Sequence, residues 1–371
     1  MSTPPTPSAG RGGNLLALAI TQVVITATGL ALQIGLARVL GDESYGSYRF
    51  LAMLAGMFGF LADFSIPTLL ARQVARDESS AAERLGTGLG AIALLALVPI
   101  GLTVAYTAFA DGRAWMIVAA VAAGSTMGAL ASRGVTESIF QGLRRMQPLV
   151  LANAIGRVVY LVGVVAALSV GAGIAGVFAA AAAGPIVSAG VLLVRFVRDV
   201  GRPIVPSLNH VTTLIRDGVP FGLHRAFMGL YLAGDLLVIQ AFWGEAELGA
   251  YGVATLLLIQ LPVADVLVRA AYPTLAQAVG SPDRAGEILG RLLRLLLTLG
   301  LPIAVGGLWV APDLIPAVFG PDYATAIPLF CVVLWVLPLR FANGAASGAL
   351  AALDRQPTRT RAIIAIALFN L

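Results

Sequence analysis

Residues 36–50 read LARVLGDESYGSYRF, and a similar sequence, FWGEAELGAYGVAT, follows at residues 242–255. The shared pattern G-x-x-x-x-G-x-Y begins at Gly41 and begins again at Gly244. In both places a short polar turn separates two long apolar runs, and glycine permits the sharp reversal that such a turn needs. The tyrosine of each copy is expected at a membrane interface. The sequence therefore predicts the same two-helix hairpin twice in one chain.

Two further landmarks recur in the same order. IPTL at residues 66–69 resembles YPTL at residues 272–275, and LRR with QP at residues 143–148 resembles LDRQP at residues 353–357. Three landmarks in one order indicate an internal duplication. Because six predicted spans separate the copies, both copies enter the membrane from the same side, and the repeat is parallel, with its axis along the membrane normal.

The composition is that of a membrane protein. Apolar residues make up 58% of the 371 positions and charged residues only 12%, whereas about a quarter of a typical soluble domain is charged. A helix that spans a bilayer needs about 20 mostly apolar residues. We therefore expect an all-α, polytopic bundle with ten spans and the start of an eleventh near residue 361. The spans are expected near 15–37, 47–70, 86–109, 115–137, 149–170, 173–194, 218–242, 249–272, 292–311 and 325–348.

The repeat and the loops predict the domain organisation. Residues 1–14 are rich in Pro, Gly and Ser and are expected to be a disordered tail. Residues 15–195 would form a first lobe of six helices, residues 196–217 a basic cytoplasmic linker, and residues 218–371 a second lobe of helices 7–10 and the start of helix 11, which is truncated relative to six. Arginine gathers in alternate loops, which places the N-terminus in the cytoplasm by the positive-inside rule.

Several functional classes are disfavoured by composition. The net charge of +5 is explained by cytoplasmic loops, so no nucleic-acid partner is expected. The single cysteine, Cys331, excludes an intramolecular disulfide, and two distant histidines leave no metal-ligand cluster. The chain has no lysine and hence no P-loop of the G-x-x-x-x-G-K type, so ATP hydrolysis by that route is excluded. No cofactor is expected.

Charged residues inside the predicted spans are the candidate site residues, because a charge in the bilayer costs about 3 kcal/mol and usually faces a cavity or a partner. Arginine suits a diphosphate, since its planar fork donates two hydrogen bonds and stays protonated. For Arg133, pairing with Glu137 one helical turn away is an alternative. The candidate phosphate-binding and cavity residues are Arg157, Arg225, Arg340, Arg133 and His224.

Three intramembrane aspartates, Asp63, Asp235 and Asp265, are candidates for binding a coupling cation. Asp63 and Asp265 lie at matching depths in the two copies. A structural interpretation stays open for each of these two, as the partner of a nearby arginine, or, for Asp63, as the cap of a bent helix before Pro67. Asp235 could pair loosely with Arg225.

The two turns, together with LADFSIPTLLARQVARDES at residues 61–79 and YLAGDLLVIQAFWGEAELGAYGVAT at residues 231–255, resemble the polysaccharide-biosynthesis branch of the multidrug/oligosaccharidyl-lipid/polysaccharide exporter superfamily, which contains the Wzx-type O-antigen flippases. The resemblance covers about residues 14–370. It implies a MATE-like fold, in which two six-helix lobes form a V around a central cavity. The family normally has at least twelve spans, more than this chain contains.

The resemblance implies a function as well. The expected activity is flipping of an undecaprenyl-diphosphate-linked oligosaccharide across a bacterial cytoplasmic membrane, with no chemistry on the substrate and therefore no enzyme activity. Membrane lipid, the lipid-linked oligosaccharide, and a glycan polymerase or glycosyltransferases would be its partners. A cation-coupled multidrug exporter of the same superfamily is the main alternative. A membrane-embedded lipid-sugar glycosyltransferase or polymerase is disfavoured because the predicted outer loops are short.

Overall fold

The computed structural model describes residues 10–110, 112–205, 207–259, 263–353 and 361, without side chains for residues 10–25 and for several residues between 220 and 273. This part of the chain is helical and contains no strand. The α-helices are α1 (Gly10–Gly59), α2 (Ile66–Arg76), α3 (Ala81–Leu95), α4 (Leu97–Ala110), α5 (Ala114–Gly142), α6 (Gln147–Ser169), α7 (Gly173–Asp199), α8 (Leu208–Phe242), α9 (Glu245–Ile259), α10 (Val263–Ala276), α11 (Pro282–Phe319), α12 (Ala326–Leu334) and α13 (Val336–Ala352). Short 3-10 helices are η1 (Phe60–Ala62), η2 (Glu78–Ser80) and η3 (Pro321–Thr325). The predicted all-α class is confirmed.

Long apolar helices account for most of the predicted spans. Within the described residues, six helical stretches are long and apolar enough to cross a membrane, or seven if α12 and α13, which meet at an angle of 43°, form one span. The predicted span 15–37 and the beginning of the predicted span 47–70 both fall within α1, which is two helices that meet at a kink at Gly41, where the backbone is not helical. The predicted spans 218–242 and 249–272 lie partly outside the described side chains. The chain is a multi-pass membrane protein.

The helices fall into two compact units. The first unit consists of residues 1–45 and 249–359, and the second consists of residues 46–248 and 360–371. The lobes 15–195 and 218–371 stay a prediction. In the two compact units, the first helix of each repeat copy groups with the remaining helices of the other copy. The division points, after Tyr45 and after Leu248, are equivalent positions in the two copies of the turn.

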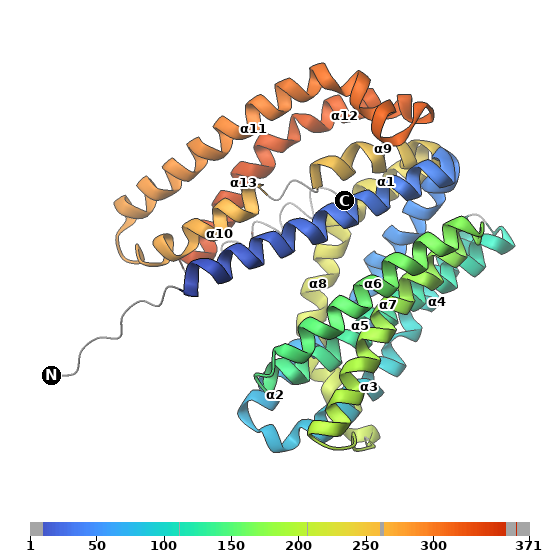
Figure 1. Cartoon of the computed structure of the whole chain (residues 1–371), viewed down its shortest axis with the longest axis vertical. Coiled ribbons are helices and arrows are strands. Elements are labelled where there is room, and N and C mark those ends of the chain that lie inside the picture. The colour runs from blue at the N-terminus through green and yellow to red at the C-terminus, as the bar shows by residue number, and fades with distance from the viewer. Residues whose placement is uncertain (1–9, 111, 206, 260–262, 354–360, 362–371) are drawn as a thin grey trace. The chain divides into compact units, whose positions relative to one another are not determined.

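The second unit is built around α5 and α7. Figure 1 shows α5, α6 and α7 running side by side. A methyl group placed on Gly156 of α6 would lie 2.8 Å from the carbonyl oxygen of Gly184 on α7, and one on Gly184 would lie 2.6 Å from that of Gly156. Small residues allow two membrane helices to approach this closely. At the end of the bundle, Phe140 and Phe196 pack edge to face with ring centroids 6.2 Å apart.

The predicted linker, residues 196–217, is shorter than expected. Helix α7 extends to Asp199 and α8 begins at Leu208, so only residues 200–207 lie between the helices. This connection is held on α3: the Ile204 N–H donates to the carbonyl of Ala82 at 3.1 Å, and a methyl group on Gly86 would lie 1.8 Å from the Ile204 carbonyl oxygen.

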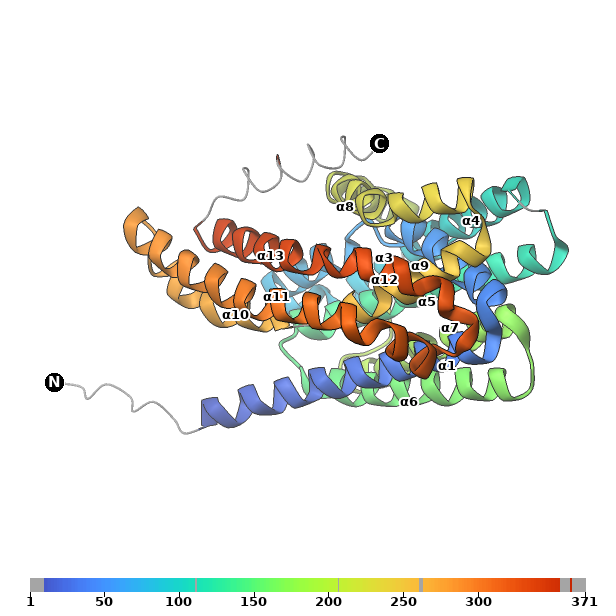
Figure 2. The same cartoon turned by 90° about the horizontal axis from the view of Figure 1, so that it is seen from above.

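The first unit joins the beginning of α1 to helices from the second half of the chain. Figure 2 shows α10, α11 and α13 side by side. The Arg38 guanidinium donates to the carbonyls of Val318, at 2.6 Å, and Ala317 at the end of α11, where helical carbonyls lack partners. The Tyr323 hydroxyl donates to the carbonyl of Ala37 at 3.0 Å. These contacts explain why the first helix groups with the second half.

The repeated turn behaves as the sequence predicts at its first glycine. Gly41 has φ +75° and ψ 174°, and the equivalent Gly244 has φ +98°, which are conformations that residues with a side chain rarely adopt. Tyr48 is 8% exposed, and its ring stacks on Phe178 with centroids 5.1 Å apart. It is therefore part of the second unit's interior.

Candidate functional site

A break in the second helix of the first repeat is the most unusual backbone feature of the second unit. Phe64 and Ser65 have φ of +42° and +59°, in the left-handed region that residues with a side chain rarely occupy. The Asp63 carboxylate accepts the Ser65 N–H at 3.0 Å, and the Ile66 N–H donates to the Asp63 carbonyl at 2.7 Å. These bonds satisfy backbone groups that have no water to bind in a membrane. The interpretation of Asp63 as a cap agrees with this geometry.

Helix α8 packs against this break through two glycines. A methyl group on Gly222 would lie 2.2 Å from the Phe64 ring, and one on Gly218 would lie 2.8 Å from the Phe64 carbonyl oxygen. Arg225 follows Gly222 by three residues, or about 4.5 Å along the helix axis. The side chains of His224 and Arg225 lie outside the described residues, so only their place on α8 is established.

Helix α5 supports the same break from another direction. Gly134 lies against the ring of Pro67, and a methyl group placed on this glycine would lie 3.4 Å from a ring carbon. The neighbouring Arg133 pairs with Glu137, with 3.0 Å between Nε and Oε1. The ion pair is therefore formed, as one of the two interpretations of Arg133 predicted. Gly134 of α5 and Gly218 and Gly222 of α8 therefore contact the segment that contains the helix break.

Helices α9 (Glu245–Ile259) and α10 (Val263–Ala276) belong to the second repeat, and residues 260–262 lie outside the described residues. The Arg340 guanidinium on α13 donates to the carbonyl of Leu258 on α9 at 3.1 Å. The side chain of Asp265 lies outside the described residues.

Arg157 lies on α6, ten residues after Gln147 in a helix of 23 residues. This is the middle of the span, as predicted. The guanidinium carbon lies 5.2 Å from the centre of the Tyr160 ring, which is a cation–π contact that offsets part of the cost of burying a charge. The side chain is half-buried and follows Gly156, where α6 and α7 are in closest contact.

Asp235 is exposed on α8, and its carboxylate accepts the N–H of the next residue, Leu236, at 2.9 Å. The predicted site residues are therefore spread over two units. Asp63, Arg133, Arg157 and Asp235 belong to the second unit, whereas Arg340 belongs to the first.

Sequence reasoning missed the contact between the break and α8. The signal was available, because Gly218 and Gly222 form a G-x-x-x-G pattern, which is typical of closely packed membrane helices. It also missed the left-handed pair Phe64–Ser65, for which the preceding Asp63 and the following Pro67 are the only sequence signals.

The sequence agrees with one family over most of its length. The family described as polysaccharide biosynthesis protein matches residues 12–279. The chain belongs to the polysaccharide biosynthesis protein family. No curated protein sequence matches it.

Solved structures with the same fold are transporters and a flippase. An inward-facing MATE family multidrug resistance transporter of the MOP superfamily matches with a TM-score of 0.67 and 16% identity, over 93% of this chain and 84% of that chain. The lipid II flippase MurJ in an inward closed conformation matches with a TM-score of 0.74 and 15% identity, over 95% of this chain and 79% of that chain. At these identities the likeness shows that this polysaccharide biosynthesis protein has the fold of the MOP superfamily.

Proposed function

We propose that this polysaccharide biosynthesis protein is a flippase that moves an undecaprenyl-diphosphate-linked oligosaccharide across the bacterial cytoplasmic membrane by alternating access. The observation that supports this best is the helix break at residues 63–65, where Phe64 and Ser65 have positive φ and the Asp63 carboxylate accepts the Ser65 N–H. In transporters built from repeats, interrupted membrane helices form the substrate and ion sites. The family and the fold agree with the proposal.

The chemistry of the charged residues also fits a phosphorylated substrate. Arg157 lies at mid-span, and Arg340 donates to the backbone carbonyl of Leu258 on α9. Together with Arg225 and His224, they would bind the diphosphate, because guanidinium groups donate paired, charge-assisted hydrogen bonds to phosphate oxygens. Arg133 would contribute less, since Glu137 already neutralises it. The lipid tail would stay in the bilayer while the sugar crosses.

Coupling to an ion would involve the aspartates. Asp63 is the best placed of them, because it lies in the break itself and is only partly buried. A cation bound there would bridge the carboxylate and the backbone groups of the bent segment. Asp235 and Asp265 are the other two residues that we propose to bind the coupling cation. The N-terminus would lie in the cytoplasm, and glycan polymerase or glycosyltransferases would act before and after the flippase.

Accumulation of lipid-linked oligosaccharide in the inner leaflet tests the proposal. A deletion strain should accumulate the carrier, and the wild-type gene should relieve the block. R157Q and R340Q should each reduce export about tenfold or more, as expected for loss of a phosphate contact worth about 1.5–3 kcal/mol. The double variant R133Q/E137Q is the matched control and should retain export. Normal export in the deletion strain would disprove the proposed function.

A cation-coupled multidrug exporter is a second candidate, favoured by the fold match to a MATE transporter and by the carboxylate at the break. Several arginines in the membrane would repel the cationic drugs that such exporters handle. Efflux of a cationic dye from cells that express the protein separates the two candidates: dye efflux that depends on Asp63, with unchanged glycan export, would favour the exporter.

A further inference from the structure

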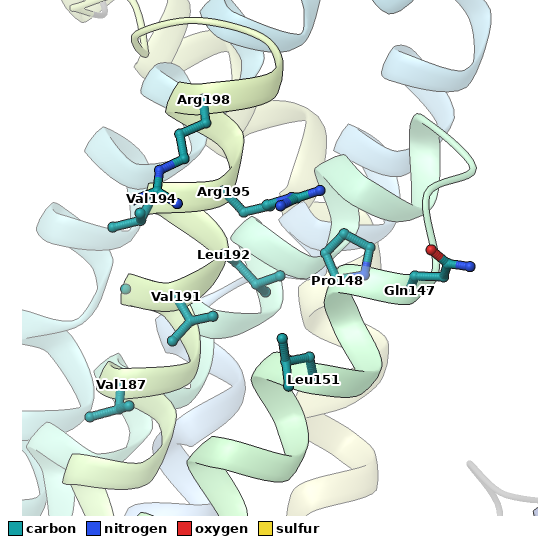
Figure 3. Close-up of a pocket in the computed structure, with 10 residues that line it drawn as sticks. Gln147, Pro148, Leu151, Val187, Val191, Leu192, Val194, Arg195 and Arg198 are labelled. Carbon is teal, nitrogen blue, oxygen red and sulfur yellow. The ribbon is translucent and has the colours of Figure 1, made fainter.

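A groove lies between α6 and α7 in the second unit, and none of its lining residues belongs to the helix break or to α8. It has a volume of about 650 Å³ and is lined by Gln147, Pro148, Leu151, Val187, Gly190, Val191, Leu192, Val194, Arg195 and Arg198. Figure 3 shows that the aliphatic side chains occupy its length, and that both arginines are at the end of α7. The groove therefore combines an apolar floor with a basic end.

The length of the groove matches one membrane leaflet. Val187 and Arg198 are eleven residues apart on α7, which is about 16 Å along the helix axis. Half of the hydrocarbon core is about 15 Å thick. When Val187 lies near the middle of the bilayer, Arg198 lies at the level of the headgroups. An acyl chain would fill the aliphatic part while its headgroup meets the arginines.

The charge at the basic end is only partly neutralised. The Arg195 guanidinium pairs with Asp199 at 2.9 Å, and Arg145 approaches the same carboxylate at 3.9 Å. Arg198 pairs with no carboxylate among the described residues. One carboxylate therefore faces three arginines, and the excess positive charge is complementary to a phosphodiester.

We propose that this groove is a binding site for an anionic phospholipid, with the phosphodiester on Arg195 and Arg198 and one acyl chain against Leu151, Val187 and Val191. Basic pockets between membrane helices at a headgroup level recognise anionic lipids in this way. A sugar-bearing carrier fits less well, because Gln147 and the two arginines are the only polar side chains of the lining. The argument for this site uses only residues of α6, α7 and the α5–α6 connection and does not depend on the proposed function.

The groove can be filled without disturbing the protein. Gly190 is an exposed lining residue, and a methyl group placed on it has no neighbour within 4 Å. G190F therefore puts a ring into the groove. Gly101 on α4 has the same open surroundings and is not part of the lining, so G101F is the matched control. For the charges, R195Q/R198Q is compared with R72Q/R76Q, which removes two exposed arginines from α2 in the same unit.

Binding is measured on the purified full-length protein by native mass spectrometry, with titration of dioleoylphosphatidylglycerol and of zwitterionic dioleoylphosphatidylcholine. Each arginine is expected to contribute roughly one kcal/mol to binding an anionic lipid, so R195Q/R198Q should weaken phosphatidylglycerol binding about thirtyfold. The same variant should leave phosphatidylcholine binding unchanged. G190F should weaken phosphatidylglycerol binding about tenfold or more, while R72Q/R76Q and G101F should not.

A gain of binding is predicted as well. D199N removes the carboxylate that competes for Arg195, so phosphatidylglycerol should bind more tightly, by about fivefold. The proposal is wrong if R195Q/R198Q and G190F weaken phosphatidylglycerol no more than their controls do. It is also wrong if undecaprenyl diphosphate displaces phosphatidylglycerol and its own binding is lost in G190F, because the groove would then belong to the carrier.

Discussion

Asp63 has two separable roles at the scale of a single residue. Its carboxylate accepts the Ser65 N–H at 3.0 Å and so stabilises the bent backbone, and in the proposed function the same carboxylate would bind the coupling cation. Asparagine keeps an acceptor oxygen in the same place, but alanine does not. The two substitutions therefore separate structure from charge.

D63N should change the free energy of unfolding by less than about 0.5 kcal/mol, whereas D63A should destabilise by about 1 kcal/mol, as loss of a capping side chain does. Thermal unfolding of the purified protein measures both. If Asp63 binds the coupling ion, D63N abolishes export although its Tm is unchanged. If D63N instead exports at the wild-type rate, Asp63 does not bind the coupling ion and only stabilises the bent backbone.

The Arg133–Glu137 ion pair is a second single-residue case. Removing one partner leaves a charge in a half-buried position, so E137Q should destabilise by about 1–2 kcal/mol. R133Q/E137Q should recover most of this loss because no charge is left unpaired. A double-mutant cycle of Tm values measures the coupling. Additive single effects would mean that the pair contributes nothing to stability.

At the scale of helices, one end of the second unit depends on one close approach. A methyl group on Gly46 of α1 would lie 1.8 Å from the carbonyl oxygen of Glu245. The Glu245 carboxylate also accepts hydrogen bonds from the Ser47 hydroxyl and the Arg113 guanidinium. Glu245 therefore connects Gly46 and Ser47, which follow the first turn, with Arg113 at the beginning of α5.

G46A should destabilise the protein by about 1–3 kcal/mol because the added methyl group must displace backbone atoms. Gly35 on the same helix has open space around it, so G35A should be neutral or stabilising by up to about 1 kcal/mol. Thermal unfolding of both variants checks this. Equal Tm values for G46A and G35A would show that the contact at Glu245 is easily relaxed.

The helices and the repeat could be predicted from the sequence because both depend on local signals. Runs of apolar residues indicated the spans, and Gly41 and Gly244 indicated the turns. The helix break at Asp63, Phe64 and Ser65 was harder to predict, because in the sequence these residues resemble an ordinary polar interruption. The packing of α8 against Phe64 distinguishes them, and it is visible only in the structure. The role of Arg340 depends on the Leu258 carbonyl, which is 82 positions away and has no sequence signature.

At the scale of the whole molecule, local signals in the sequence do not show which helices form one compact unit. Span order along the chain says nothing about whether the first helix packs with its own copy of the repeat. Arg38 and Tyr323 decide this for α1, and Gly218 and Gly222 decide it for α8. All four contacts join residues far apart in sequence.

Cutting the chain in the connection between α7 and α8 tests this organisation. Fragments 1–201 and 202–371, expressed together, should copurify. Fragment 1–201 contains most of the second unit but lacks α8, and fragment 202–371 contains most of the first unit but lacks residues 1–45. Expressed alone, fragment 1–201 should aggregate in detergent, since the surface around Phe64 loses α8. Size-exclusion chromatography of tagged fragments measures both outcomes. A monodisperse fragment 1–201 would contradict the assignment.

The equivalent division points after Tyr45 and Leu248 have a consequence for how such a chain could arise. A protein with a single copy of the repeat could complete its bundle only by borrowing the first helix of a second molecule, which is a domain-swapped dimer. Gene fusion would convert that exchange into an intramolecular one, at an effective concentration of about millimolar. In that case each copy of the turn corresponds to the hinge loop through which the first helix of one subunit crossed to the other.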